Sequence, residues 1–317
     1  IINNDMADNT SGYFKHPLFG TPLHEGTPID INGETLYLTY NGGDGNDVTL
    51  KTTPIINGTT GDDNFVVRRV AASANFEVSI DGGSNFVNLG AVTSITINGS
   101  GGDDTLLVDY ANGQAIPGTG LVGEGLFFNG NGQATVAGDA LGIRGTGTQL
   151  TTYRPDASLN GNGVVEIDGR SLTFTGLEPL DFDNVGTFTL DLANDDDDVT
   201  ITNGLNSMVT GAAEGVGTVQ ALVLSGTSGG VSFEAAHVFR TTNVVIDTDL
   251  TTNGDDTVTI ASANNVHLNT NLTINTGIGD TDSIVVNGSI ANFAGAVLLR
   301  DAETVDINAN VTAGTNL

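Results

Sequence analysis

Cysteine and tryptophan are absent from this chain of 317 residues, and Lys and Arg together number only 9. Without cysteine the chain has no disulfides and no thiol chemistry. So few basic residues do not attract nucleic acid, whose phosphates are bound by clusters of Lys and Arg. The longest apolar runs are far shorter than a membrane span. We therefore expect neither a nucleic-acid-binding protein nor a membrane-spanning segment in this chain.

Acidic residues, glycine and small aliphatic residues dominate what is present. The 38 Asp and Glu give a formal net charge of −29, and 44 residues are glycine. The acidic residues punctuate apolar stretches and form no single block, so we expect a folded chain, not a disordered one. Aromatic residues make up 6%, which favours a narrow core of Val, Ile, Leu and Ala. The acidic surface would attract divalent cations.

Short β-strand patterns recur along the whole chain, whereas no helix-length window has a convincing apolar period of 3.6 residues. Alternating or β-branched runs lie at 35–40 (TLYLTY), 94–97 (SITI), 187–192 (TFTLDL), 257–260 (TVTI) and 266–274 (VHLNTNLTI). Turns rich in Asn, Gly and Asp close them.

The repeating unit is a turn followed by a strand. It reads GTTGDDNF at 58–65, GSGGDDTL at 99–106 and NGDDTV at 253–258, with looser copies NDDDDVTI at 194–201 and GIGDTDSI at 277–284. Glycine permits a positive φ at the corner, and Asp side chains accept hydrogen bonds from nearby backbone N–H groups. A stack of β coils requires such corners. We predict an all-β fold, a parallel β-helix or β-solenoid, with room for β-sandwich-like elements in the N-terminal half.

The spacing of these turns divides the chain into three predicted segments. Residues 1–53 are predicted to be the tail of a preceding β repeat module, 54–180 a Gly/Asp-turn β module, and 181–317 β-solenoid coils. Both ends stop in mid-pattern, so we expect a piece of a larger protein.

The candidate metal ligands are the carboxylates of the turns, since Ca²⁺ prefers hard oxygen ligands. Residues 42–50 (GGDGNDVTL) resemble the nonapeptide of haemolysin-type calcium-binding repeats, in which two successive coils share one Ca²⁺. Thr49 replaces the large apolar residue of that motif, and no second nonapeptide follows in tandem, so a structural turn and a Ca²⁺ site both stay open. The full candidate set is Asp44, Asp47, Asp62, Asp63, Asp103, Asp104, Asp195, Asp196, Asp197, Asp198, Asp255 and Asp256.

Longer stretches resemble known repeat modules. Residues 19–50 look like the closing segment of modules with autotransporter-associated β-strand repeats. GTTGDDNFVV, SITINGSGGDDTLLVD, LTFTGLEPLD and TFTLDLANDDDDVTI resemble modules of giant secreted or surface proteins of planctomycetes and related bacteria. This resemblance covers residues 1–205, and the rest shares the style of filamentous-haemagglutinin-like solenoids. The resemblance implies a cell-surface location and structural or adhesive roles, without catalytic residues.

From these patterns we expect an extracellular structural or adhesive repeat protein: a matrix, sheath, fibre or adhesin-stalk component that associates with itself or with neighbouring modules. One alternative is a glycan- or host-surface-binding module, for which Phe127 and Phe128 are the nearest aromatic patch. Another is a β-helix polysaccharide lyase or hydrolase acting through Asp195–Asp198. We expect no enzyme, because basic residues to neutralise a uronate and aromatic residues to stack sugars are scarce.

Overall fold

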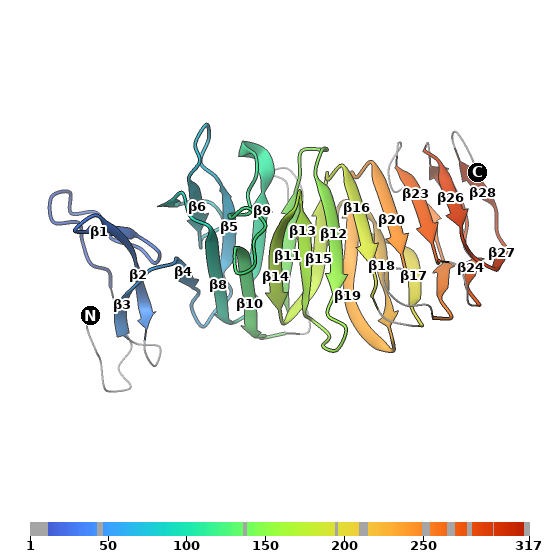
Figure 1. Cartoon of the computed structure of the whole chain (residues 1–317), viewed down its shortest axis with the longest axis horizontal. Coiled ribbons are helices and arrows are strands. Elements are labelled where there is room, and N and C mark those ends of the chain that lie inside the picture. The colour runs from blue at the N-terminus through green and yellow to red at the C-terminus, as the bar shows by residue number, and fades with distance from the viewer. Residues whose placement is uncertain are drawn as a thin grey trace.

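The computed structural model describes residues 12–42, 47–135, 138–193, 196–208, 215–248, 254–264, 270–277, 281–293 and 295–313. In these residues all regular structure is β-strand except one 3₁₀ turn, η1 (Tyr110–Asn112). The all-β prediction is confirmed. The strands lie side by side along the long axis of the molecule (Figure 1).

A small antiparallel sheet covers the N-terminal end of this stack. It consists of β1 (Pro28–Ile31), β2 (Glu34–Gly42) and β3 (Asp47–Lys51), which pack around Leu38, Tyr40 and Val48. It is tied to the rest of the molecule by the Tyr37 hydroxyl, which donates to the Leu89 carbonyl at 3.0 Å. The buried Glu25 carboxylate accepts from both Tyr40 N and Asn57 Nδ2.

Two long sheets form the body of the molecule. The ten-stranded sheet contains, in spatial order, β26 (Val297–Arg300), β23 (Asn271–Asn275), β20 (Asn243–Asp247), β16 (Thr187–Asp191), β12 (Leu150–Pro155), β13 (Gly163–Ile167), β14 (Arg170–Thr175), β10 (Gly125–Gly132), β8 (Ser94–Gly101) and β4 (Ile55–Asn57). The twelve-stranded sheet contains β27 (Thr304–Ile307), β24 (Ser283–Val286), β21 (Thr257–Ile260), β17 (Asp198–Leu205), β18 (Gln220–Ser228), β19 (Val231–Phe239), β15 (Leu177–Asp183), β11 (Asp139–Arg144), β9 (Thr105–Asp109), β5 (Asn64–Arg69), β6 (Phe76–Ser79) and β7 (Val87–Gly90). A third, three-stranded sheet, β22 (Ala263–Asn264), β25 (Ile290–Phe293) and β28 (Val311–Ala313), lies in the C-terminal part.

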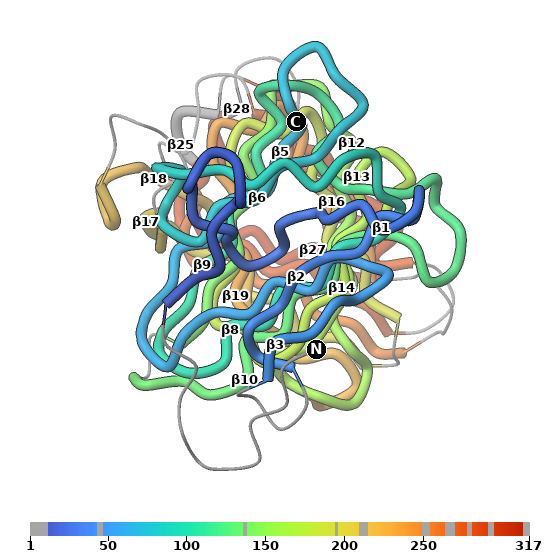
Figure 2. The backbone as a smooth tube through the Cα atoms, turned by 90° about the vertical axis from the view of Figure 1, so that its left-hand side faces the viewer, coloured from blue at the N-terminus to red at the C-terminus, as the bar shows by residue number. Residues whose placement is uncertain are grey.

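The chain alternates between the two long sheets, and most neighbouring strands within each sheet are parallel. β8, β10, β14 and β16, β20, β23, β26 alternate along the chain with β9, β11, β15 and β17, β21, β24, β27. One pass of the chain through both sheets is called a coil. Viewed down the long axis, successive coils overlie one another around a shared interior (Figure 2). Parallel pairing of this kind places equivalent residues of successive coils directly above one another.

Each long sheet contains one antiparallel insertion between its parallel strands, and the twelve-stranded sheet also ends in the antiparallel run β5–β6–β7. The chain passes through β12, β13 and β14 within the ten-stranded sheet, and through β17, β18 and β19 within the other. As a result, two strands separate β14 from β16 in one sheet, and two separate β15 from β17 in the other. Because each insertion adds two strands to its sheet, strands of the same coil stay opposite each other in the two sheets.

One continuous hydrophobic cluster fills the interior between the sheets. Its members alternate with outward residues along each strand, as in β8, where Ile95 and Ile97 are fully buried. Phe128 of β10 is also fully buried and packs edge-on against Phe65 of β5. Of the two residues Phe127 and Phe128, Phe128 therefore belongs to the core.

No helix in the described part of the chain has the length and hydropathy that a membrane crossing would need.

Candidate functional site: the acidic corner

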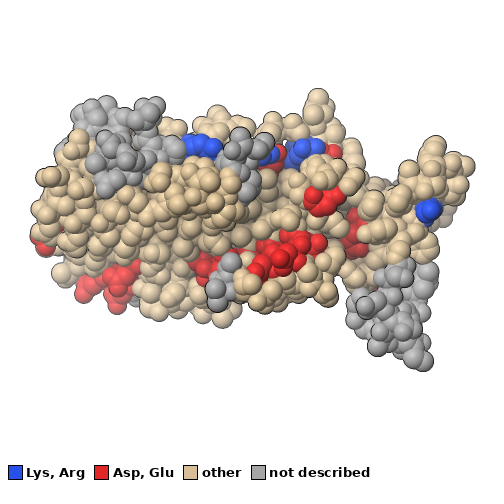
Figure 3. Space-filling model, turned by 180° about the vertical axis from the view of Figure 1, so that it is seen from behind, with Lys and Arg blue, Asp and Glu red and all other residues tan. Residues whose placement is uncertain are grey.

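The acidic turns recur where the chain leaves the ten-stranded sheet and enters the other. They precede β5, β9, β17, β21, β24 and β27, and Asp139 occupies the matching place as the first residue of β11. Asp and Glu gather along one edge of the molecule (Figure 3). Successive turns are aligned because the strands on either side are in parallel register.

The second Asp of each turn forms an inner ladder. The backbone N–H of Asp63 donates to Oδ1 of Asp104 at 2.8 Å, and the N–H of Asp104 donates to Oδ1 of Asp139 at 2.7 Å. Asp104 and Asp139 are both fully buried. Each inner carboxylate therefore satisfies a backbone donor of the preceding coil that no strand pairs.

The first Asp of each turn forms an outer ladder that points the opposite way. The N–H of Asp103 donates to Oδ1 of Asp62 at 2.9 Å. The Asp103 carboxylate in turn accepts the N–H groups of Ala134 and Thr135, each at 2.9 Å, and the Thr135 hydroxyl at 2.5 Å. Adjacent coils are thus linked reciprocally.

The same two ladders recur in the C-terminal half. The inner ladder runs from Asp197 N to Asp256 Oδ1 (2.8 Å), from Asp256 N to Asp282 Oδ1 (2.9 Å) and from Asp282 N to Glu303 Oε2 (2.7 Å). The outer ladder runs from Asp255 N to Asp196 Oδ1 (2.9 Å) and from Thr281 N to Asp255 Oδ1 (3.1 Å).

The two positions of a turn differ in electrostatics. Burial, together with the nearby Asp139, Asp63 and Asp62 charges, raises the pKa of Asp104 to about 6. Burial likewise raises the pKa of Asp139, and that of Asp256 to about 6. In contrast, hydrogen bonds from Thr135 and Ala134 lower the pKa of the half-buried Asp103 carboxyl. The ordinary value for Asp is about 3.9.

The structure brings together Asp62, Asp63, Asp103 and Asp104 in one group, and Asp196, Asp197, Asp255 and Asp256 in another. Asp47 begins β3, away from both groups, and Asp198 is an exposed residue that begins β17. Asp44 and Asp195 lie outside the described residues.

The described turns form a hydrogen-bond ladder. Within the described residues, no group of three or more Asp, Glu or His side chains is placed to hold a metal ion. At each step of the described ladders, a carboxylate oxygen accepts a backbone N–H of a neighbouring coil.

Asparagine side chains form a further ladder that the sequence reasoning missed. Asn98 Nδ2 donates to Asn57 Oδ1 at 2.7 Å, and Asn129 Nδ2 donates to Asn98 Oδ1 at 2.8 Å. Asn271 and Asn243 repeat the contact at 2.8 Å. A signal was present: Asn-Gly stands at 57–58, 98–99 and 129–130, with the Asn six to ten residues before Asp63, Asp104 and Asp139. The inner acids Asp139, Asp282 and Glu303 were also missed.

A second charged row joins strands of the twelve-stranded sheet. Arg68, Asp109, Arg144 and Asp183 are register neighbours on β5, β9, β11 and β15. Arg144 forms a two-pronged ion pair with the buried Asp109 carboxylate, and Arg240 does the same with Asp183. Arg144 and Arg240 therefore neutralise buried carboxylates in this row.

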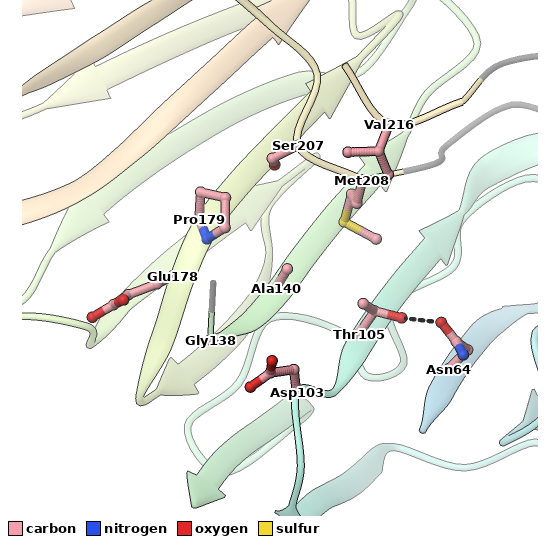
Figure 4. A pocket seen from close by; sticks show the side chains of 10 residues that line it. All are labelled: Asn64, Asp103, Thr105, Gly138, Ala140, Glu178, Pro179, Ser207, Met208 and Val216. Carbon is pink, nitrogen blue, oxygen red and sulfur yellow. Dashed lines mark hydrogen bonds between the residues drawn. The ribbon is translucent and has the colours of Figure 1, made fainter. Parts of the chain in front are cut away.

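The outer face of the twelve-stranded sheet carries a groove of about 670 Å³. Asn64, Thr105, Ala140 and Pro179 belong to the strands β5, β9, β11 and β15, while Met208 and Val216 belong to the segment between β17 and β18 (Figure 4). Ser207 and Met208 are held by the buried Asp181, whose carboxylate accepts Ser207 N and Met208 N, each at 2.9 Å, and the Ser207 hydroxyl at 2.5 Å. Burial raises the pKa of Asp181 to about 6.

No protein-family model, no curated protein and no solved structure matches this chain.

Proposed function

We propose that this chain is a structural segment of an extracellular repeat protein, a stiff β-solenoid rod serving as part of a matrix, fibre or adhesin stalk. The observation that carries the proposal is the unbroken stacking of coils along the molecule. Two sheets extend over the whole stack, and amide, carboxylate and Arg–Asp contacts join several successive coils. In such an array, stability is a sum of contacts between neighbouring coils.

The two ends of the stack differ, which supports growth in one direction. At the N-terminal end, the small sheet packs against β4 and β7. At the other end, Val305 and Ile307 of β27 continue the inward rows of Ile284 and Val286, yet they are 43% and 52% exposed. Among the described strands, β27 pairs only with β24. An uncovered edge with apolar residues on its inner side is suited to adding a further β coil.

We infer that the further coil comes from a second copy of this chain. For the chain as given, light scattering should detect end-to-end oligomers whose mass grows with protein concentration. Val305→Lys should abolish them, because a charge on the inward row of the edge opposes stacking. Val216→Lys, at a residue exposed on a side loop, is the matched control and should leave association unchanged. A strictly monomeric chain at all concentrations would contradict the assembly.

The location is tested separately on producing cells. Antibodies against the folded chain should label intact cells or the material around them, and external protease should remove that label. Labelling that appears only after the cells are permeabilised would refute an extracellular role.

A further inference from the structure

Three polar side chains converge where the small N-terminal sheet meets the body of the molecule. Along β2, Tyr37 belongs to the main core and Leu38 to the small core of the N-terminal sheet. Because side chains alternate along a strand, Thr39 faces the body as Tyr37 does. Asn57 ends β4, and Glu25 precedes β1 in the chain. Thr39 is 1% exposed and Glu25 is 8% exposed, so the place where they meet is shielded from water.

The Asn57 amide contacts both of the other side chains. Its Nδ2 donates to Glu25 Oε1 at 3.0 Å and to Thr39 Oγ1 at 3.0 Å. The Thr39 hydroxyl is in turn hydrogen-bonded to the Glu25 carboxylate. Because Nδ2 is bonded directly to Cγ of the amide, Thr39 Oγ1 is at most one C–N bond length farther from that carbon. A hydroxyl and an amide held this close react without the entropy cost of an encounter.

The carbonyl oxygen of the same amide is hydrogen-bonded as well. Asn98 Nδ2 donates to Asn57 Oδ1 at 2.7 Å. Negative charge would develop on this oxygen if a nucleophile attacked Cγ, and a donor already in place stabilises that charge. Asn57 is thus the end of the asparagine ladder, and its NH₂ group meets an acid and a hydroxyl. A nucleophile beside a base, and a carbonyl held by a donor, are the parts that acyl transfer requires.

We propose that Thr39 and Asn57 form an intramolecular ester bond with loss of ammonia, and that Glu25 transfers the proton. The Glu25 carboxylate takes the hydroxyl proton as Thr39 Oγ1 bonds to Cγ of Asn57, and Asn98 Nδ2 stabilises the charge on Oδ1. The C–N bond then breaks, and Nδ2 takes the proton from Glu25 and leaves as ammonia. The carboxylate is regenerated, no electrons are gained or lost, and no co-reactant is needed.

The surroundings of Glu25 suit this role. Burial is the leading cause that raises the pKa of Glu25, although a hydrogen bond from Thr39 opposes it. A carboxylate with a raised pKa is a stronger base than an exposed one. The next residue, Gly26, has a φ of +77°, and a Cβ there would collide with the Ile56 side chain. Glycine therefore lets the segment that carries Glu25 lie directly against β4.

The ester bond joins β2 of the N-terminal sheet to β4 of the first coil covalently. Without it, the contacts across this boundary are packing and hydrogen bonds such as the one from the Tyr37 hydroxyl to the Leu89 carbonyl. This inference goes beyond the proposed structural function and does not depend on it.

Mass spectrometry of the chain after unfolding and digestion with trypsin tests the proposal. Trypsin cleaves after Lys51, between Thr39 and Asn57, so an unmodified chain yields the separate peptides 16–51 and 52–68. We expect one joined species, lighter than the two peptides together by one ammonia. Recovery of the two peptides apart and unmodified would overturn the proposal. Loss of ammonia within 52–68 alone would also overturn it, because the Asn57 side chain would then have reacted with its own backbone.

Three variants test the roles of the individual side chains. Thr39→Val removes the hydroxyl at nearly the same shape and should abolish the joined species. Thr49→Val is the matched control, since Thr49 pairs with Thr39 across β2 and β3, and should leave the joined species unchanged. Glu25→Gln should lower the joined fraction by about tenfold or more at a fixed time after folding, because a positioned acid–base group contributes about 10²–10⁴ in rate.

The outcomes separate the bond from the role of the acid. A joined species that persists in Thr39→Val would refute the ester bond. A joined fraction in Glu25→Gln equal to that of the parent chain would refute proton transfer by Glu25. Should a variant fail to fold, the digest of the parent chain still decides whether the bond forms.

Discussion

Asn98 is the middle residue of an amide ladder that joins three coils. Its Nδ2 donates to Asn57 and its Oδ1 accepts from Asn129. Asn98→Ala leaves one acceptor and one donor of its neighbours unpaired, so we expect the free energy of unfolding to fall by about 2 kcal/mol. Urea denaturation measures this. Asn88→Ala, which removes a single exposed bond to Gly90 N, is the control, and an equal loss in both variants would show that the ladder adds nothing.

Which residues form the side-chain ladders could be predicted from the sequence only in part. The Gly–Asp–Asp turns are visible because the pattern repeats along the chain. Asp139 was missed because it lacks a second Asp beside it, and Asn98 read as half of an Asn-Gly turn. The ladder contacts join residues 31 to 41 positions apart, and such pairs follow from the strand register, which local sequence does not specify.

At the scale of elements, a strand in the interior of the stack should contribute far more than a strand at its edge. Val165 lies in the middle of β13, between β12 and β14, and is fully buried, whereas Val305 lies on the edge strand β27 and is 43% exposed. Val165→Ala should cost about 2 kcal/mol of stability, because it leaves a small cavity in a packed core. Val305→Ala should cost less than about 0.5 kcal/mol.

Native-state hydrogen exchange offers an independent reading of the same difference. Amides of β13 and β14 should exchange only through global unfolding, whereas those of β27 should exchange through local fraying. Uniform protection along the stack would mean that the coils unfold as one unit and that the edge is not weak.

The existence of most strands was predictable at this scale, but their order was not. The runs at 94–97 and 257–260 fall within β8 and β21, because alternation of buried and exposed residues has the same period in any sheet. The antiparallel insertions β12–β14 and β17–β19 show the same alternation as the parallel strands. Their reversal depends on pairings such as β15 with β19, which only the three-dimensional structure reveals.

For the whole molecule, the acids whose pKa values are shifted by folding predict that the protein is most stable in mild acid. Burial is the leading cause that raises the pKa of Asp104, Asp181 and Asp256 to about 6 and that of Glu234 to about 7. The folded chain thus retains protons that the unfolded chain has already lost by about pH 4–5. Their stabilising contribution is complete below about pH 4 and is lost as the pH rises to about 6–7.

A smaller set of acids with lowered pKa values has the opposite effect and sets the lower limit of the pH range of greatest stability. Hydrogen bonds from Ser79 and Asn85 lower the pKa of Asp81 to about 2, and Asp103 shifts in the same direction. Their contribution is present above about pH 4 and is lost as the pH falls toward 2. Repulsion within a chain of net charge −29 also weakens as carboxylates gain protons. We therefore expect the urea midpoint to peak near pH 4–5 and to decline toward pH 7. A midpoint that climbs steadily from pH 4 to pH 7 would contradict this prediction, because it would show that the ionised form of the buried acids is the more stabilising one.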